Sequence, residues 1–179
     1  MTKKTNIALI GMPGAGKSTV GKLLAEQLDM NFCDTDQLIE QAEQSPLQDI
    51  LDTNGFEALR AIEQQTILDH QFDNSVIATG GSVIYGADGI AHLQSCATLF
   101  YLNASIDTLT QRINNWSSRG IACPQSQSFD QLFAERAPFY KQYADHTILA
   151  DGQNSDINHI VAQIVDLWRG TVSTDPASR

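Results

Sequence analysis

The sequence predicts an α/β fold in which a five-stranded parallel sheet carries helices on both faces. Two observations predict it. Short apolar runs alternate with longer segments of helical periodicity, and that alternation is typical of parallel strands joined by helical crossovers. The runs are apolar almost throughout, as expected of strands that are buried on both faces. The predicted strands are Asn6–Ile10, Phe32–Asp34, Val76–Thr79, Ala97–Leu102 and Thr147–Ala150.

The helices are predicted from the spacing of their apolar residues. In the first one, Val20, Leu24 and Leu28 share a face. Ser105 is placed to cap the fourth helix, and Pro138 predicts a kink or break in the fifth. The predicted helices are Lys17–Leu28, Asp36–Glu43, Phe56–Phe72, Ile106–Asn115, Ser128–Tyr143 and Asp156–Arg169.

The chain has 179 residues, which is the length of one domain. We assign residues 1–170 to this domain. The polar stretch Trp116–Gln127 lacks any regular period, and we expect it to form a mobile lid over the carboxyl edge of the sheet, where ligands of such folds bind. We expect the polar segment 171–179 to be a disordered tail.

Composition limits the environment and the partners of the protein. A net charge of −10 argues against a nucleic-acid or anionic-membrane partner. No apolar run approaches the ~18 residues of a membrane-spanning helix. Three scattered cysteines favour a reduced protein of the cytoplasm. We further expect a monomer that acts on a small molecule.

The segment Gly11–Ser18 matches the phosphate-loop pattern GxxxxGK[ST]. Its glycines let backbone N–H groups face a phosphate, and the following helix adds the positive end of its dipole. We expect Lys17, in an exposed loop, to reach the β- and γ-phosphates of ATP, and Ser18 to bind Mg²⁺. The alternative is a glycine turn with an exposed lysine. The expected nucleotide contacts are Gly11, Gly14, Ala15, Gly16, Lys17, Ser18 and Thr19.

Two carboxylates follow the second predicted strand, in the sequence Asp34-Thr35-Asp36. A parallel sheet places both at its carboxyl edge, beside the phosphate loop. Asp34 is then a candidate ligand for Mg²⁺, and Asp36 a candidate acceptor for the hydrogen of a substrate hydroxyl group. The alternative is that Asp36 is only the N-cap of the helix that follows.

These motifs resemble those of the shikimate kinase family. The resemblance covers about residues 5–150 and includes the phosphate loop, FCDTDQLIE, GFEALRAIE, VIATGGSVI and ERAPFY, in that order. It implies a three-layer P-loop kinase fold and transfer of the γ-phosphate of MgATP to the 3-hydroxyl group of shikimate, in the pathway to chorismate.

The resemblance also implies roles for individual residues. Arg60 and Arg136 would clamp the substrate carboxylate, as arginine forks do, and Glu63 would lie near Arg60. The other implied roles are substrate binding by Asp36, a backbone contact from Gly81, an adenine contact from Arg112 and, in the lid, a contact of Arg119 with the transferred phosphate.

The sequence departs from the family pattern in three places. Ser82 replaces the third glycine of Gly-Gly-Gly and would crowd the substrate or add a hydroxyl contact. The lid sequence, Arg-Pro-Leu-Leu in the family, is here Arg-Gly-Ile-Ala at 119–122. In the Gly-Glu-x-x-Phe-Arg motif, Phe56 and Leu59 replace the glutamate and the phenylalanine.

These departures leave three functions open. Phosphoryl transfer to shikimate is the first, and the alternatives are a related kinase for another hydroxy acid or polyol and a non-catalytic ATP-binding module.

Overall fold

The computed structural model describes residues 4–113, 120–151 and 156–173. In these ranges five parallel strands form one sheet in the order β2-β3-β1-β4-β5, which confirms the predicted sheet. Every residue of β1, the central strand, is buried. The strands are β1 (Asn6–Ile10), β2 (Asn31–Asp34), β3 (Ser75–Ala78), β4 (Ala97–Asn103) and β5 (His146–Leu149).

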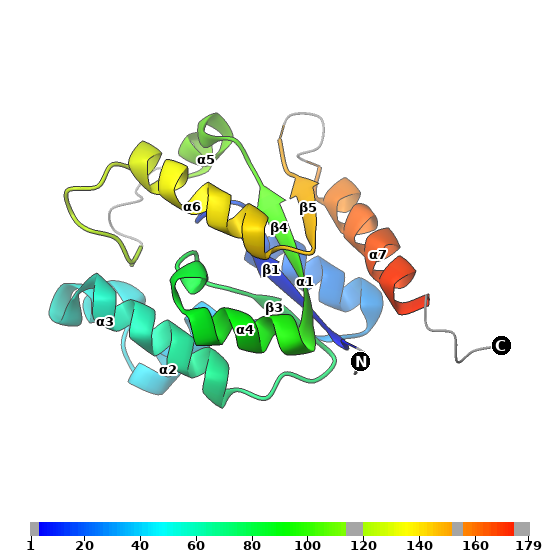
Figure 1. Ribbon diagram of the computed structural model, residues 1–179, viewed down its shortest axis with the longest axis horizontal. Coiled ribbons are helices and arrows are strands. Elements are labelled where there is room, and N and C mark those ends of the chain that lie inside the picture. The colour runs from blue at the N-terminus through cyan, green and yellow to red at the C-terminus, as the bar shows by residue number, and fades with distance from the viewer. Residues whose placement is uncertain (1–3, 114–119, 152–155, 174–179) are drawn as a thin grey trace.

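Helices cover both faces of the sheet. Figure 1 shows α4 and α6 in front of the strands and α1 behind them, and α7 packs against α1. The helices are α1 (Lys17–Leu28), α2 (Thr35–Glu43), α3 (Leu47–Asp69), the 3₁₀ helix η1 (Val83–Tyr85), α4 (Ala87–Cys96), α5 (Ile106–Arg112), α6 (Phe129–Tyr143) and α7 (Ile157–Ser173).

Several helices differ from the prediction. Helix α3 begins nine residues earlier than expected and is interrupted at Gly55, whose φ of 83° lies in the left-handed region. Helix α6 continues through Pro138 without a break. Helix α7 reaches Ser173, so the first part of the predicted tail is helical, while residues 174–179 lie outside the described ranges.

Neither η1 nor α4 was predicted from the sequence. Helix α4 packs closely on α3 because it begins beside two glycines: a Cβ at Gly86 would stand 2.8 Å from Gln64 Oε1, and one at Gly89 would stand 3.4 Å from Gln64 Cγ. A short helix with two glycines at its start has weak local propensity, so this helix depends on contacts with α3 that no local pattern contains.

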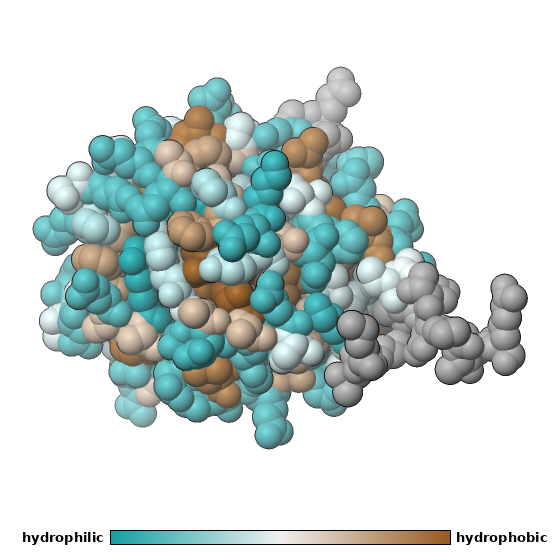
Figure 2. Space-filling model, viewed as in Figure 1, coloured by the Kyte–Doolittle hydropathy of each residue, from teal (hydrophilic) through white to brown (hydrophobic). Residues whose placement is uncertain are grey.

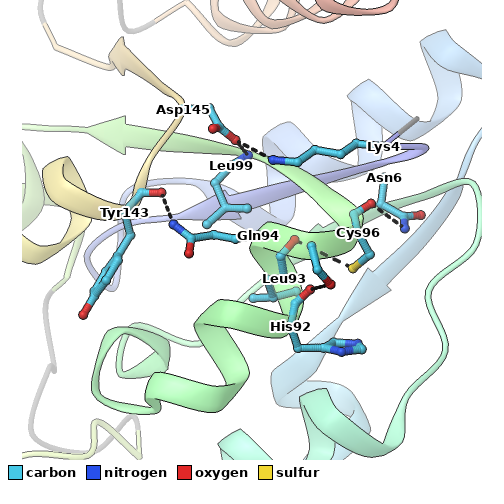
Figure 3. Close-up of polar contacts among 10 residues, drawn as sticks. Lys4, Asn6, His92, Leu93, Gln94, Cys96, Leu99, Tyr143 and Asp145 are labelled. Atoms are coloured by element: carbon cyan, nitrogen blue, oxygen red, sulfur yellow. Dashed lines mark hydrogen bonds and ion pairs between the residues drawn. The ribbon is translucent and has the colours of Figure 1, made fainter. Parts of the chain in front are cut away.

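The amino edge of the sheet is fixed by paired polar groups (Figure 3). The amide of Asn6, which is 1% exposed, donates to the carbonyl oxygens of Phe72 and Cys96 and accepts from Ser75 N. Asp145 Oδ2 accepts from Leu99 N at 2.9 Å and lies 3.4 Å from the ammonium group of Lys4. These bonds join three neighbouring strands at the edge away from the phosphate loop.

The surface in Figure 2 is largely hydrophilic, with hydrophobic patches of limited size between polar side chains. All three cysteines are free thiols in the structure. No described helix is both long and apolar enough to span a membrane.

Candidate functional site

The phosphate loop lies between β1 and α1, where glycines with positive φ values turn the backbone. Gly11, Gly14 and Gly16 have φ values of 147°, 81° and 96°, which L-residues with side chains rarely adopt. A Cβ at Gly11 would stand 2.8 Å from Leu102 O. Gly16 is the N-cap of α1 and provides no side-chain cap, so the first N–H groups of the helix have no side-chain partner there and are suited to an anion.

Lys17 is buried, contrary to the exposed position we expected from the sequence. Its side chain folds back over the loop, and Nζ donates to Gly11 O at 2.8 Å and to Met12 O at 2.9 Å. Burial lowers the pKa of the ammonium group to about 8, against the opposing effect of Asp36, Asp34 and Glu63. Two carbonyl oxygens thus hold the ammonium group of Lys17, which could exchange them for phosphate oxygens when a nucleotide binds.

Ser18 and Asp34 are in direct contact beside this loop. Ser18 Oγ donates to Asp34 Oδ2 at 2.7 Å. Asp34 Oδ1 accepts a hydrogen bond from Asp36 N at 3.1 Å. Asp34, rather than Asp36, is therefore the N-cap of α2. A hydroxyl and a carboxylate oxygen fit Mg²⁺, which typically takes one or two protein oxygens together with phosphate oxygens and water. No group of three or more histidine, cysteine or acidic side chains suited to a metal ion occurs within the described ranges.

Two further carboxylates, Asp36 and Glu63, meet over Gly80. A Cβ at Gly80 would overlap Glu63 Oε1 and stand 2.8 Å from Asp36 Oδ1. Burial is the main cause that raises the pKa of Asp36 to about 6, with Asp34 adding to it. Burial, followed by the charge of Asp36, raises the pKa of Glu63 to about 7. Both groups therefore titrate near neutral pH, as groups at functional sites often do.

The Ser82 hydroxyl group donates to Glu63 Oε2. It therefore binds a protein carboxylate, which the sequence did not suggest. Glu63 Oε1 has no hydrogen-bond partner, although Glu63 is only 3% exposed. A buried oxygen without a partner is costly, so this atom is available to a ligand hydroxyl group.

Arg60 and Arg136 come from α3 and α6 and meet at a single oxygen. Arg60 donates from Nε and Nη2 to Ala122 O at 3.2 and 3.0 Å, and Arg136 Nη2 donates to the same oxygen at 2.8 Å. Arg136 is 1% exposed, and its Nε has no partner. The structure thus brings together two guanidinium groups that the sequence placed 76 positions apart.

The described part of the predicted lid packs inward. Gly120 N donates to Gln48 Oε1 at 2.7 Å, and Ala122 is buried in a small cluster with Ile39, Ile50 and Leu59. Arg119 and residues 114–118 lie outside the described ranges. Arg112 ends α5, with Nη2 3.4 Å from Ala150 O.

One cavity of about 530 Å³ connects these groups. Its lining includes the phosphate loop, Asp36, Glu63 and Arg136, whereas Gly11, Asp34 and Arg60 do not line it. Ile121 and Ala122, from the predicted lid, also line the cavity. Sequence reasoning missed Leu47 in the lining, since an apolar side chain carries no motif. Predicted residues in the lining are Gly14, Ala15, Gly16, Lys17, Ser18, Thr19, Asp36, Gly81, Arg112 and Arg136.

Comparisons with known proteins agree on one family. The sequence profile of shikimate kinase matches residues 13–168. A shikimate kinase of Haemophilus influenzae is 34% identical over 171 residues, covering 93% of this chain and 94% of that protein. One of Vibrio parahaemolyticus is 33% identical over 170 residues, with 93% and 98% covered.

Solved structures give the same result. The shikimate kinase of Acinetobacter baumannii, in complex with shikimate, superposes with a TM-score of 0.82 at 27% identity and covers 94% of this chain and 95% of its own. A shikimate kinase of Bacteroides thetaiotaomicron gives 0.76 at 28% identity, with 92% and 98% covered. A deoxyadenosine kinase of M. mycoides shares the fold at 16% identity, with a TM-score of 0.57 and coverage of 92% and 98%.

Proposed function

The chain belongs to the shikimate kinase family, and we propose that it transfers the γ-phosphoryl group of ATP to the 3-hydroxyl group of shikimate. One observation carries this proposal. The phosphate loop shares a cavity with Arg136, and Arg136 meets Arg60 at one oxygen atom. A phosphate donor and a carboxylate-bearing acceptor can therefore lie next to each other in one cavity.

On the donor side, the loop residues bind and orient the triphosphate. Lys17 would exchange the carbonyl oxygens of Gly11 and Met12 for the β- and γ-phosphate oxygens. Ser18 and Asp34 would hold Mg²⁺, which when bound neutralises charge on the phosphates. Arg112 would lie against the adenine, and Arg119 would contact the transferred phosphate.

On the acceptor side, Asp36 orients the hydroxyl group. The hydroxyl oxygen forms a bond to the γ-phosphorus, the bond from that phosphorus to the bridging oxygen of ADP breaks, and the hydroxyl proton passes to the Asp36 carboxylate. A pKa of about 6 leaves this carboxylate ionised at neutral pH and still basic enough to accept a proton. Gly81 contributes backbone close to the substrate, since a Cβ there would stand 2.9 Å from Pro13 Cδ and 3.0 Å from Arg136 Nη1.

The carboxylate of shikimate would bind where Ala122 O now meets Arg60 and Arg136. A bidentate, charge-assisted pair suits a planar carboxylate better than a neutral group. A neutral polyol would leave two positive charges unpaired, and a non-catalytic module would have no use for an acidic group beside the acceptor.

An ADP-release assay tests the proposal with shikimate, its carboxamide and a neutral polyol as acceptors. We expect shikimate to be phosphorylated with the lowest KM. In Arg60→Ala and Arg136→Ala, the KM for shikimate should rise ~10- to 150-fold, because each change removes a charge-assisted hydrogen bond. Lysine at either site should restore binding only in part. A polyol that served as well as shikimate would overturn the proposal, and ADP release that no acceptor stimulates would favour the binding module.

A further inference from the structure

The two arginines of the proposed clamp lie close together without a direct ion pair to any acidic residue in the described ranges. Neither guanidinium group forms an ion pair with a described residue, and the pair that is present joins Lys4 to Asp145 at the opposite edge of the sheet. Both arginines donate to Ala122 O, which holds two like charges close together. Such charges repel more strongly in a partly buried site than in water. The charges of Glu135 and Glu63 oppose part of this repulsion without forming ion pairs with the arginines, and a group in direct contact with both guanidinium groups would oppose more of it.

Tyr85 is that group. Arg60 Cζ lies 3.6 Å from the centroid of the Tyr85 ring, and Arg136 Cζ lies 5.3 Å from it. An aromatic face is electron-rich and attracts a cation within about 6 Å of its centroid. One ring therefore attracts both guanidinium groups and stabilises them next to each other.

The backbone and the hydroxyl group of Tyr85 fix the position of its ring. Tyr85 ends η1, which begins directly after Ser82, so the ring stands three residues from the Ser82–Glu63 contact. Its hydroxyl group donates to Glu135 Oε1 on α6, the residue next to Arg136. The ring is thus tied to the helix that carries one of the two arginines.

An aromatic partner leaves the charge and the N–H groups of an arginine available to a ligand, whereas an acidic partner does not. A carboxylate would neutralise an arginine and occupy its N–H groups, whereas a ring face attracts the cation and leaves the N–H groups free. Phe56, which replaces the glutamate of the family motif, also has its ring 4.9 Å from Arg60 Cζ. Arg60 therefore contacts two rings and keeps its charge for a ligand.

We propose that Tyr85 is a positioning residue of the acceptor site, whose ring holds Arg60 and Arg136 ready for the substrate carboxylate without neutralising them. The role rests on the proposed function, because it concerns the same carboxylate. It adds a residue that determines specificity for an anionic acceptor over a neutral acceptor of the same shape.

The test compares shikimate with its carboxamide, which keeps the ring and the hydroxyl groups but has no charge. The KM of shikimate and the inhibition constant of the carboxamide are measured for the wild type, Y85L, Y85F and F139L. Y85L removes the aromatic face, whereas Y85F keeps that face and removes the hydroxyl group with its contacts to Glu135 and Arg136. F139L is the matched control, since Phe139 neighbours Tyr85 with ring centroids 6.4 Å apart but is 37% exposed.

In Y85L the KM of shikimate should rise about 5- to 30-fold, the range expected for cation–π contacts in a desolvated site. The carboxamide constant and the KM of ATP should change less than about twofold, since neither ligand uses the charge of the clamp. Y85F and F139L should keep the wild-type preference for shikimate. A Y85L enzyme with the wild-type preference, or a Y85F enzyme that loses it to the same extent, would overturn the proposal.

A graded series tests the same role without altering the shape of the side chain. Phenylalanine with one, two or three ring fluorines at position 85 weakens the aromatic face stepwise, so log KM for shikimate should rise with each fluorine. A flat series would contradict the role of the ring. Failure of the proposed function itself would look different, because the wild type would then bind shikimate and the carboxamide equally well.

Discussion

The two edges of the sheet differ in how completely their buried polar side chains are paired. At the amino edge, each side-chain polar atom of Asn6 is paired with backbone. Figure 3 shows its bond to Cys96 and the pairing of Asp145 with Lys4 and Leu99. At the carboxyl edge, Glu63 Oε1 and Arg136 Nε are buried without any hydrogen-bond partner.

This difference indicates that the amino edge contributes mainly to stability and the carboxyl edge mainly to function. Paired polar groups join strands and contribute to folding. Unpaired charges at the other edge cost stability, and such a cost is tolerated where a ligand completes the bonds. Substitutions at the carboxyl edge should therefore affect catalysis and spare stability, while those at the amino edge should do the reverse.

The largest effect on turnover is expected for Lys17→Ala. Turnover should fall at least ~100-fold, which corresponds to about 2.7 kcal/mol of transition-state stabilisation. Urea unfolding should show little change, because the lost ammonium group was buried at a cost in solvation. Lys22→Ala, at an exposed site of the same helix, is the control. A variant that kept more than about a tenth of the wild-type turnover would refute the role of Lys17.

Asp36→Asn should lower turnover by about 100-fold and leave the KM of ATP within about twofold, because the carboxylate acts on the acceptor. With the pKa of Asp36 raised to about 6, wild-type turnover should rise with pH through that value as the carboxylate ionises. The asparagine variant should lack this rise. Steady-state kinetics between pH 5 and 8 measures both effects, and equal damage to ATP binding would make Asp36 a metal-site or structural residue.

Much of the fold could be predicted because its signals are local. The bounds of β1 and α1 were predicted without error, since an apolar run, a glycine loop and a helical apolar face stand next to one another. By contrast, α4 depends on its contact with Gln64 of α3. A contact between residues distant in sequence leaves no periodic pattern.

The site was predictable to the extent that it consists of charged residues in motifs. Arg60 and Arg136 do meet, but the oxygen between them belongs to the backbone of Ala122, and any residue type supplies such an oxygen. The burial of Lys17 was missed for a similar reason, because its side chain folds back onto the backbone oxygens of Gly11 and Met12. The monomeric state, the cytoplasmic location, the absence of nucleic-acid partners and the role of Arg119 stay predictions.

At the amino edge, Asn6→Ala should destabilise the protein by about 3 kcal/mol, because it leaves three buried or partly buried backbone groups without their partner. The KM and turnover of the remaining folded enzyme should match the wild type. Asn31→Ala, at an exposed asparagine of the same edge whose side chain donates to Asp73 O, should cost less than about 1 kcal/mol. A large kinetic change in Asn6→Ala would show that the two edges are not independent.

The smallest effect, and the most direct test of the comparison, concerns Glu63. Burial raises its pKa from 4.5 to about 7 in the folded protein. An acid whose pKa is raised by folding contributes stability below its unfolded value and loses that contribution as the pH rises through the folded value. Wild-type stability should therefore decrease between about pH 5 and 7.5, with Glu63 accounting for about 2 kcal/mol of the decrease.

Glu63→Gln should remove that part of the decrease, since an amide does not ionise. Asp36, whose pKa is raised in the same direction, should leave a smaller slope in the variant. Lys17, with a pKa of about 8, stays mainly protonated below pH 7.5 and adds little to the slope. Urea unfolding at pH 5 and 7.5 measures the change, with Glu57→Gln at an exposed site of α3 as the matched control. Equal slopes in Glu63→Gln and the wild type would mean that the Glu63 carboxylate is no more costly to ionise in the fold than in water, and the contrast between the two edges would then lose its electrostatic basis.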